Sequence, residues 1–209
     1  MARTAREQDE ARTADAPLTP ANTPVIADPG PLGLGAFAMT TFVLSVFNAG
    51  LLDAKLEAVV LPLALFYGGA CQLLAGMWEF RKGNTFGALA FSSFGAFWLA
   101  YFFLARYVAA GLGPDAHKAV GLFLLAWTIF TAYMLVASLR VSLAVVVVFA
   151  LLTLTFLALT IGAFGDKTGI TRLGGWLGLL TALAAWYASF AGVTNATWRR
   201  DVLPVGPRA

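Results

Sequence analysis

Six stretches of the 209-residue chain contain no Asp, Glu, Lys or Arg, and each is long enough to cross a membrane as a helix. These stretches are residues 29–52, 58–78, 83–105, 119–139, 141–165 and 173–198. A helix needs about 20 apolar residues to span roughly 30 Å of hydrocarbon. None of the stretches has the alternating pattern, about 10 residues long, of a transmembrane β-strand. The sequence therefore predicts an all-α membrane protein with six transmembrane helices.

The composition agrees with a chain that is dissolved in lipid. Hydrophobic residues make up 59% of the sequence and charged residues 12%, about half the roughly 25% of an ordinary soluble domain. So few polar groups could not cover the surface of a soluble globule. The formal net charge of +3 does not indicate nucleic-acid binding, because the basic residues are spread over the helix ends and form no single patch.

Turn-forming segments separate the predicted helices, for example residues 111–115 and 165–169. The helices are expected at about residues 32–51, 57–80, 85–108, 118–139, 142–163 and 171–197. The chain then divides into a disordered cytoplasmic tail (1–27), a six-helix membrane domain (28–200) and a cytoplasmic C-terminal tail (201–209).

The distribution of Lys and Arg predicts the orientation in the membrane. With six alternating helices, the side of the two termini carries Arg3, Arg6, Arg12, Arg81, Lys82, Arg140, Arg199, Arg200 and Arg208. The other side carries Lys55, Arg106, Lys118, Lys167 and Arg172. Cytoplasmic loops carry the excess of Lys and Arg in membrane proteins. We therefore expect both termini in the cytoplasm and the helices in the cell (inner) membrane.

Residues that could carry catalysis or bind a metal are scarce. His117 is the only histidine and Cys71 the only cysteine. One His and one Cys cannot form a metal cluster, and no Walker or GxGxxG loop is present for a nucleotide. We expect no cofactor, no metal and no enzymatic activity, with His117 as an ordinary surface residue at a loop or helix entry.

Mild polar side chains enter the predicted spans along helix faces. Thr41, Ser45 and Asn48 are spaced i, i+4 and i+7 in the first span and share one face. Gln72 lies in the second span, with Tyr67 beside its face. Two interpretations stay open, because such groups either bond helices together or line a path for a solute. Asn48 and Gln72 favour a path more than a lone hydroxyl does, since an amide is costlier to hide in lipid.

A carboxylate and a pair of glycines are two further features of the predicted spans. Glu79 is the carboxylate that abuts the apolar runs, two residues before Arg81. It is either a salt-bridged end residue or a gate or proton-binding group. Gly174 and Gly178 form a small-xxx-small pair that predicts close helix packing.

Long blocks of the sequence carry a specific resemblance. DPGPLGLGAFAMTTF (28–42), followed by NAG (48–50), resembles the N-terminal signature of the acetate uptake transporter family, of the succinate–acetate permease type. That signature usually reads NPAPLGL, so Asp28 replaces Asn and Gly30 replaces Ala. Four later segments are similar to further blocks of the family. They are FYGGACQLLAGMWEFRKGNTFG (66–87), AFSSFGAFWL (90–99), GGWLGLLTALAAWYAS (174–189) and VLP (202–204). The resemblance covers about residues 28–205.

The resemblance implies six helices per protomer around a narrow central pathway, and a homo-hexamer with one pathway in each protomer. It implies passage of acetate and related short monocarboxylates and, in some members, succinate. Phe37, Phe94 and Leu152 match a hydrophobic constriction in such proteins, where position 94 is more often Tyr. The candidate polar or substrate-binding residues of the pathway are Thr40, Thr41, Asn48, Tyr67, Gln72, Asn84, Thr85 and Ala185. Glu79 is the candidate proton or gate residue.

The charge pattern limits how such a pathway would hold its solute. No Lys or Arg lies within the apolar stretches, so hydroxyls, amides and helix ends would bind a carboxylate, at about 1 kcal/mol or less each. Weak binding suits fast passage. We therefore predict a channel or permease for short carboxylates, channel-like or weakly proton-linked, whose partners are the carboxylate and the bilayer. The alternative is a membrane sensor or ammonium-linked protein of the same family.

Overall fold

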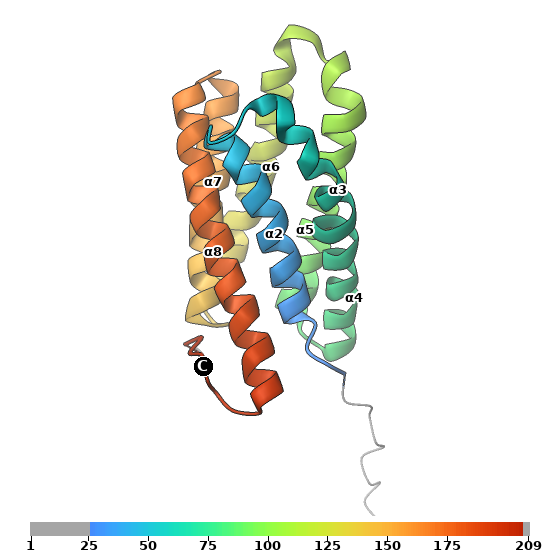
Figure 1. Ribbon diagram of the computed structural model, residues 1–209, viewed down its shortest axis with the longest axis vertical. Coiled ribbons are helices and arrows are strands. Elements are labelled where there is room, and N and C mark those ends of the chain that lie inside the picture. The colour runs from blue at the N-terminus through green and yellow to red at the C-terminus, as the bar shows by residue number, and fades with distance from the viewer. Residues whose placement is uncertain (1–25, 207–209) are drawn as a thin grey trace, which may run out of the picture.

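The computed structural model describes residues 26–206 as a bundle of long, roughly parallel helical rods (Figure 1). Six helical segments are long and apolar enough to cross a membrane: Gly30–Asn48, Ala54–Lys82, Thr85–Gly111, Gly113–Ser138, Leu143–Phe164 and Thr168–Trp198. No β-strand occurs within residues 26–206. The six helices predicted from the charge-free stretches are confirmed, with ends displaced by a few residues.

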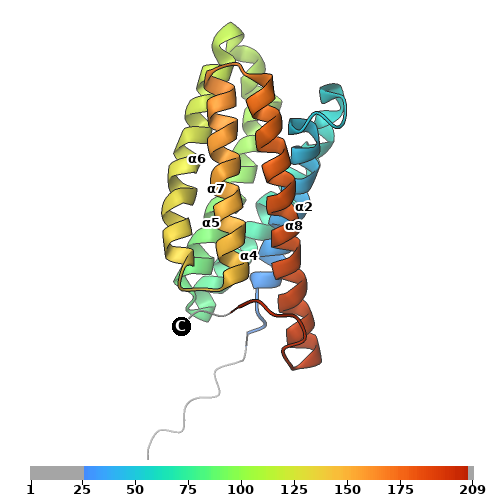
Figure 2. The same cartoon turned by 90° about the vertical axis from the view of Figure 1, so that its left-hand side faces the viewer.

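The α-helices pack as a ring in which the first and last spans are neighbours. Their bounds are α2 (Gly30–Asn48), α3 (Val60–Leu65), α4 (Gln72–Lys82), α5 (Thr85–Phe103), α6 (Ala116–Ser138), α7 (Leu143–Phe164) and α8 (Thr168–Trp198). Helix α8 packs between α2 and α7, α7 packs on α6, and α4 pairs with α5 (Figure 2). The contact between α5 and α6 is slight by comparison.

The second span is a broken helix. It begins with a 3₁₀ segment (Ala54–Val59), continues as α3, passes through a π-helical segment (Phe66–Cys71) and ends as α4. Within the π-helical segment, a side chain on Gly68 would lie 2.6 Å from the Thr40 hydroxyl of α2. The sequence predicts a helix over about residues 57–80 and gives no sign of this break. The π-helical turn accommodates an extra residue in the helix, and Gly68 allows α2 to pack closely against this segment. Neither effect changes the spacing of apolar residues, so the sequence pattern does not reveal the break.

Turns at the helix ends have ordinary local causes. Gly83 ends α4 with a φ of +81°, a left-handed conformation that favours glycine. The Asn84 side chain then accepts a hydrogen bond from the Gly87 amide at 3.1 Å and caps α5. The chain can therefore reverse between two long spans within two residues.

Glycines let the neighbours of α8 approach its backbone. A side chain on Gly178 would collide with Ser45 of α2, and one on Gly174 would lie 2.7 Å from Leu159 of α7. A side chain on Gly175 would collide with the backbone of Ala49. The predicted small-residue packing is confirmed, and it fixes the wall that α2, α7 and α8 form together.

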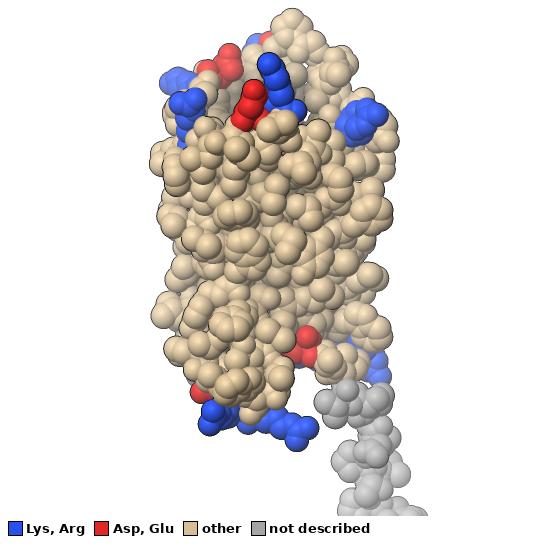
Figure 3. All heavy atoms as spheres, in the orientation of Figure 1, with Lys and Arg blue, Asp and Glu red and all other residues tan. Residues whose placement is uncertain are grey.

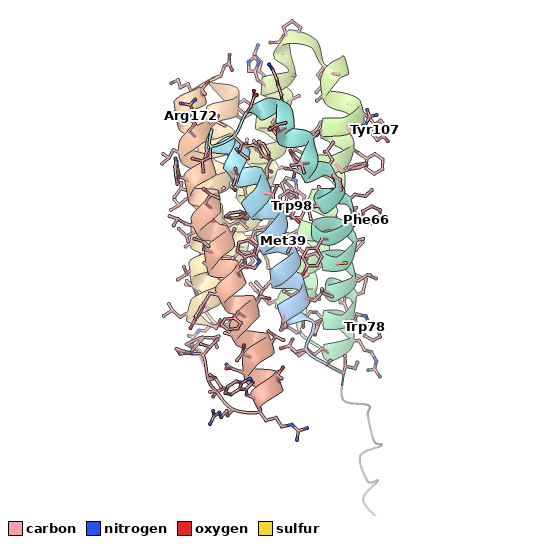
Figure 4. All side chains as sticks on the ribbon, viewed as in Figure 1. Met39, Phe66, Trp78, Trp98, Tyr107 and Arg172 are labelled. Atoms are coloured by element: carbon pink, nitrogen blue, oxygen red, sulfur yellow. The ribbon has the colours of Figure 1, made fainter. Side chains whose placement is uncertain are left out.

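The surface is divided into two charged ends and an apolar belt. In the space-filling view the Lys, Arg, Asp and Glu side chains gather near the two ends (Figure 3). Large apolar side chains are exposed between them; Phe66 and Tyr107 are 66% and 63% exposed and point outward, whereas Trp98 lies between the helices (Figure 4). Such a belt is stable against lipid tails and not against water.

Both described ends of the chain lie at the end of the bundle where α2 begins and α8 finishes, which we call the lower end (Figure 1). Residues 201–206 fold back along this end, and the Leu143 amide of α7 donates to the Gly206 carbonyl at 2.7 Å. The hydroxyl of Tyr187 donates to the Pro204 carbonyl at 2.7 Å. Most of the expected tail 1–27, and the last three residues, lie outside the described residues.

Candidate solute pathway

A cavity of about 300 Å³ occupies the upper half of the bundle interior. Its lower part is lined by Phe37 and Leu152, and its upper part by Asn48 and Thr171. Thr41, Ser45 and Asn48 all line it, so the polar face predicted on the first span points into this space. We call it the upper cavity.

The upper cavity contains one carboxylate, and that group is engaged. Among the described residues that line this cavity, Glu57 is the acidic one and none is Lys or Arg. Glu57 Oε1 accepts a hydrogen bond of 2.8 Å from the Tyr101 hydroxyl. The bond joins the 3₁₀ segment of the second span to α5 at the upper end of the bundle.

A second cavity of about 210 Å³ lies below the first, and we call it the lower cavity. Its mouth carries an ion pair in which Lys82 Nζ donates to Asp28 Oδ1 at 2.8 Å. The same oxygen accepts from the Gly30 amide at 2.9 Å, at the start of α2. Lys82 is the one Lys or Arg among the described residues that line either cavity.

Glu79 lies deeper in the lower cavity than the ion pair. Its side chain is 1% exposed, and Oε2 has no hydrogen-bond partner. The Asn84 side chain hydrogen-bonds the Glu79 carboxyl group. A side chain on Gly87 would lie 2.8 Å from Glu79 Cδ, so the carboxyl group fits against the first turn of α5 because that position is glycine.

Phe37 and Leu152 line both cavities, so the two spaces meet at these side chains. Phe94 lines the lower cavity, and its ring centroid lies 5.8 Å from that of Phe37. All three side chains are at most 4% exposed. We call these three residues the neck. The ring of Phe94 packs against those of Phe130 and Phe149, with centroid distances of 5.3 and 6.0 Å.

The structure brings together some of the predicted pathway residues and not others. Thr41 and Asn48 line the upper cavity, and Glu79 and Asn84 line the lower one. The predicted residues that line neither cavity are Thr40, Tyr67, Gln72, Thr85 and Ala185.

Each of these five residues has another environment. The Thr40 hydroxyl donates to the Ala36 carbonyl at 2.9 Å. Ala185 is wholly buried in the apolar core, and Thr85 is exposed at the start of α5. The Tyr67 hydroxyl lies near Gly35, and the buried Gln72 leaves its Oε1 without a partner.

Other cavity residues were not singled out from the sequence. Among them are Asp28 and Lys82 in the lower cavity, and Glu57, Trp98 and Tyr101 in the upper one. The signal for Asp28 was present as a departure from the family signature, but its partner Lys82 is 54 residues away. Within residues 26–206 no group of three His, Cys, Asp or Glu side chains could hold a metal ion.

The sequence model of the GPR1/FUN34/yaaH family matches residues 11–205. The chain belongs to this family. Together with the relatives described next, this match confirms the resemblance to the acetate uptake transporters of the succinate–acetate permease type.

Several relatives are named as transport proteins. Acetate permease A of Emericella nidulans is 44% identical over 195 residues, which cover 86% of this chain and 65% of the relative. Ammonia transport outward protein 2 of Saccharomyces cerevisiae is 42% identical, with 92% and 70% covered. The succinate-acetate/proton symporter SatP of Escherichia coli is 38% identical, with 87% and 96% covered. The chain thus spans about two thirds of the fungal relatives and nearly all of the bacterial one.

A solved structure described as that of the bacterial acetate channel SatP superposes on this bundle with a TM-score of 0.82. The two chains are 37% identical, and the match covers 87% of this chain and all of the other. The arrangement of the six spans is therefore the one adopted by that channel.

Proposed function

We propose that the protein is a membrane channel or permease for acetate and related short-chain carboxylates, with succinate as a further substrate, and that it has no enzymatic activity. The observation that carries this proposal is the pair of cavities that meet at Phe37 and Leu152 inside a six-helix bundle of this family. A solute of acetate size would cross by passing the neck from one cavity to the other.

The chemistry of the two cavities suits a small, partly apolar acid. Hydroxyl and amide groups line the upper cavity without a fixed cation among its described residues, so an anion is held weakly and leaves readily. At the neck the passage is bounded by two phenyl rings and a leucine. An apolar neck favours a solute that sheds water at low cost, such as a monocarboxylate or its neutral acid.

Labelled acetate uptake tests the proposal directly. Purified protein in liposomes should take up acetate faster than protein-free vesicles, and unlabelled acetate should compete with the label. A matched preparation of heat-denatured protein controls for leak through damaged bilayers. Uptake equal to that of empty vesicles would refute the proposal.

The orientation and assembly belong to the same proposal. We infer that the lower end faces the cytoplasm of the cell (inner) membrane and that the protein assembles as a homo-hexamer. Among residues 26–206 the Lys and Arg side chains divide equally between the two ends, so the cytoplasmic excess rests on Arg3, Arg6, Arg12 and Arg208. Cysteine labelling of a residue placed at each end, in intact cells, distinguishes the two orientations.

Ammonium transport is the second candidate, because one relative bears the name of an ammonia transport protein. The same liposomes answer this question when an internal pH dye reports the alkalinisation that ammonia influx would cause. A sensor role, the other alternative, predicts that deleting residues 1–27 abolishes signalling in cells. For a pore, the same deletion leaves acetate flux unchanged.

A further inference from the structure

All but one of the buried threonines among residues 26–206 have a hydrogen-bond partner for the hydroxyl. The hydroxyls of Thr40, Thr128, Thr131, Thr155 and Thr181 donate to the backbone carbonyl four residues earlier at 2.7–2.9 Å. The hydroxyl of Thr160 bonds that of Thr128. Among the buried threonines of residues 26–206, Thr41 alone has a hydroxyl without a partner. A buried hydroxyl normally finds a partner, so this one is free to bond something else.

Trp98 presents a second unused donor. Its side chain is 2% exposed, and Nε1 has no hydrogen-bond partner. The ring itself is well packed, with centroids 5.0 Å from Phe97 and 5.8 Å from Tyr101. A buried indole N–H usually bonds an acceptor. The packing therefore fixes the ring of Trp98 while leaving its polar atom unsatisfied.

Both side chains line the upper cavity, from two different helices. Thr41 belongs to α2 and Trp98 to α5, so the cavity has an unused donor on each of two walls. The nearby hydroxyl of Tyr101 is not available, because it donates to Glu57 at 2.8 Å. The Trp98 N–H and the Thr41 hydroxyl can therefore each donate a hydrogen bond to a ligand in this cavity.

We propose that Thr41 and Trp98 form a carboxylate-binding subsite in the upper cavity, with the Trp98 N–H donating to one oxygen of the carboxylate and the Thr41 hydroxyl to the other. The inference rests on the proposed transport of carboxylates and names the groups that would hold the solute above the neck. An indole N–H can only donate, so its partner must be an acceptor. A carboxylate offers two acceptor oxygens, and bonds to a charged acceptor are stronger than bonds to a neutral one.

The remainder of the cavity wall suits the apolar part of such a ligand. Phe97 and Phe156 line the same space, with ring centroids 5.3 Å apart. Among the described residues the subsite contains no Lys or Arg, so it would bind an anion through hydrogen bonds alone. Water is the competing occupant, because it too accepts hydrogen bonds.

Indole resonances provide a test that does not depend on flux. The protein is labelled with ¹⁵N at the tryptophan indole nitrogens and placed in nanodiscs, and sodium acetate is titrated against sodium chloride of equal ionic strength. The Trp98 signal, assigned by its loss in Trp98→Phe, should shift saturably with acetate and not with chloride. A Trp98 signal that acetate leaves unchanged up to the highest concentration carried by the flux assay would overturn the subsite.

Substitutions in liposomes provide the second test. Trp98→Phe and Thr41→Val each remove a donor and keep most of the shape, and each should raise the apparent KM for acetate about three- to tenfold. The matched controls are Trp186→Phe, whose ring packs on Phe42, and Thr131→Val, whose hydroxyl is already bonded within α6. Equal KM values for the donor variants and the controls would mean that the two donors bind only water.

The outcomes separate this inference from the proposed function. If the wild-type protein gives no acetate flux, the transport proposal fails, while the indole titration still reports whether acetate binds. If flux is present but neither donor variant changes KM, the subsite is wrong and transport stands. Should Trp98→Phe fail to fold, Thr41→Val and the wild-type titration still decide the matter.

Discussion

The upper and lower cavities are two halves of one interior, yet they differ in how their polar groups are satisfied. The upper cavity is the larger, at about 300 Å³ against 210 Å³, and its single described acidic residue is bonded by a tyrosine. The lower cavity has Asp28 and Lys82 at its mouth and the buried Glu79 deeper inside. Charge is therefore concentrated on one side of the neck, and unused neutral donors on the other.

In the proposed passage, the two cavities would act on a solute in different ways. Charges near a mouth act on a solute over several ångströms and are screened by salt. Neutral hydrogen bonds act only at contact, so they hold a solute that has already arrived. The lower cavity would then decide which charged species enters from that side, and the upper cavity would decide how long an acid stays.

The largest effect is expected where the two halves meet. Leu152 lines both cavities, so the bulkier ring of Leu152→Trp would fill the space in which the two cavities meet. Acetate flux in liposomes should fall at least about tenfold, to near the rate of empty vesicles, since overpacking closes the junction.

The matched control for that substitution is Leu154→Trp on the same helix, because Leu154 is 49% exposed on the outer surface. This variant should transport like the wild type. Unchanged flux in Leu152→Trp would mean that the two cavities do not belong to a single path.

A selectivity change is expected at the lower side of the neck. Phe94→Ala removes the ring that closes the lower cavity, and butyrate flux relative to acetate should rise about fivefold, since the opening becomes wider. The same change should cost about 3–5 kcal/mol of stability, as for other buried rings. Phe94→Tyr, tested in parallel, keeps the ring and adds a hydroxyl group, so the ratio of butyrate to acetate flux should stay low.

Phe130→Ala separates widening from loss of packing. Phe130 contacts Phe94 with a centroid distance of 5.3 Å but lines neither cavity. It should lower stability and leave the butyrate-to-acetate ratio near that of the wild type. An equal gain of butyrate flux in both variants would contradict the role of Phe94 as a size filter.

The membrane fold could be predicted because it follows from solvation alone. A charged side chain in hydrocarbon is costly, so the charge-free stretches mark the spans within a few residues of their observed bounds. The break at Phe66–Cys71 could not be predicted in this way. It depends on the approach of α2 to Gly68, a contact between segments that are far apart in sequence.

The residues that line the two cavities could be predicted only in part, because helix periodicity shows which residues share a face but not which neighbours that face contacts. Thr40 and Thr41 are consecutive, yet one packs against Gly68 and the other lines the upper cavity. Likewise, Gln72 and Glu79 follow one face of the second span, and only Glu79 reaches a cavity. Which side of a helix faces the interior is decided by neighbouring helices.

A smaller effect is expected at the mouth of the lower cavity, where two substitutions should change the KM for acetate in opposite directions. Asp28→Asn frees Lys82 from its ion pair, keeps a side-chain acceptor for the Gly30 amide, and should lower the KM for acetate about threefold at low salt. Lys82→Gln should raise this KM by a similar factor, and the double variant should return near the wild type. For the succinate dianion each change in KM should be about the square of the change for acetate, or roughly tenfold, because succinate carries twice the charge.

Asp201→Asn is the control for general surface charge, since Asp201 is exposed at the lower end and lines neither cavity. It should leave both solutes unaffected. If Asp28→Asn and Lys82→Gln instead slow acetate and succinate equally, the ion pair only ties the start of α2 to α4, and the comparison of the two cavities by charge is wrong.

The smallest change in rate, and the most informative about coupling, is expected from Glu79→Gln. Glu79 is the candidate proton or gate residue, and its partner-free Oε2 lies in the half of the interior that carries the charge. Glutamine has the shape of a protonated glutamate but cannot release a proton. If Glu79 carries the proton, the variant should transport acetate at every pH as the wild type does at its acidic limit, with rates there equal within about twofold.

Asn84→Ala keeps the carboxyl group while removing its hydrogen-bond partner, so it should shift the pH profile without flattening it. A Glu79→Gln profile that superposes on that of the wild type would leave the solute to carry its own proton, as in a simple channel, and would assign the charge of the lower cavity to the Asp28–Lys82 pair alone.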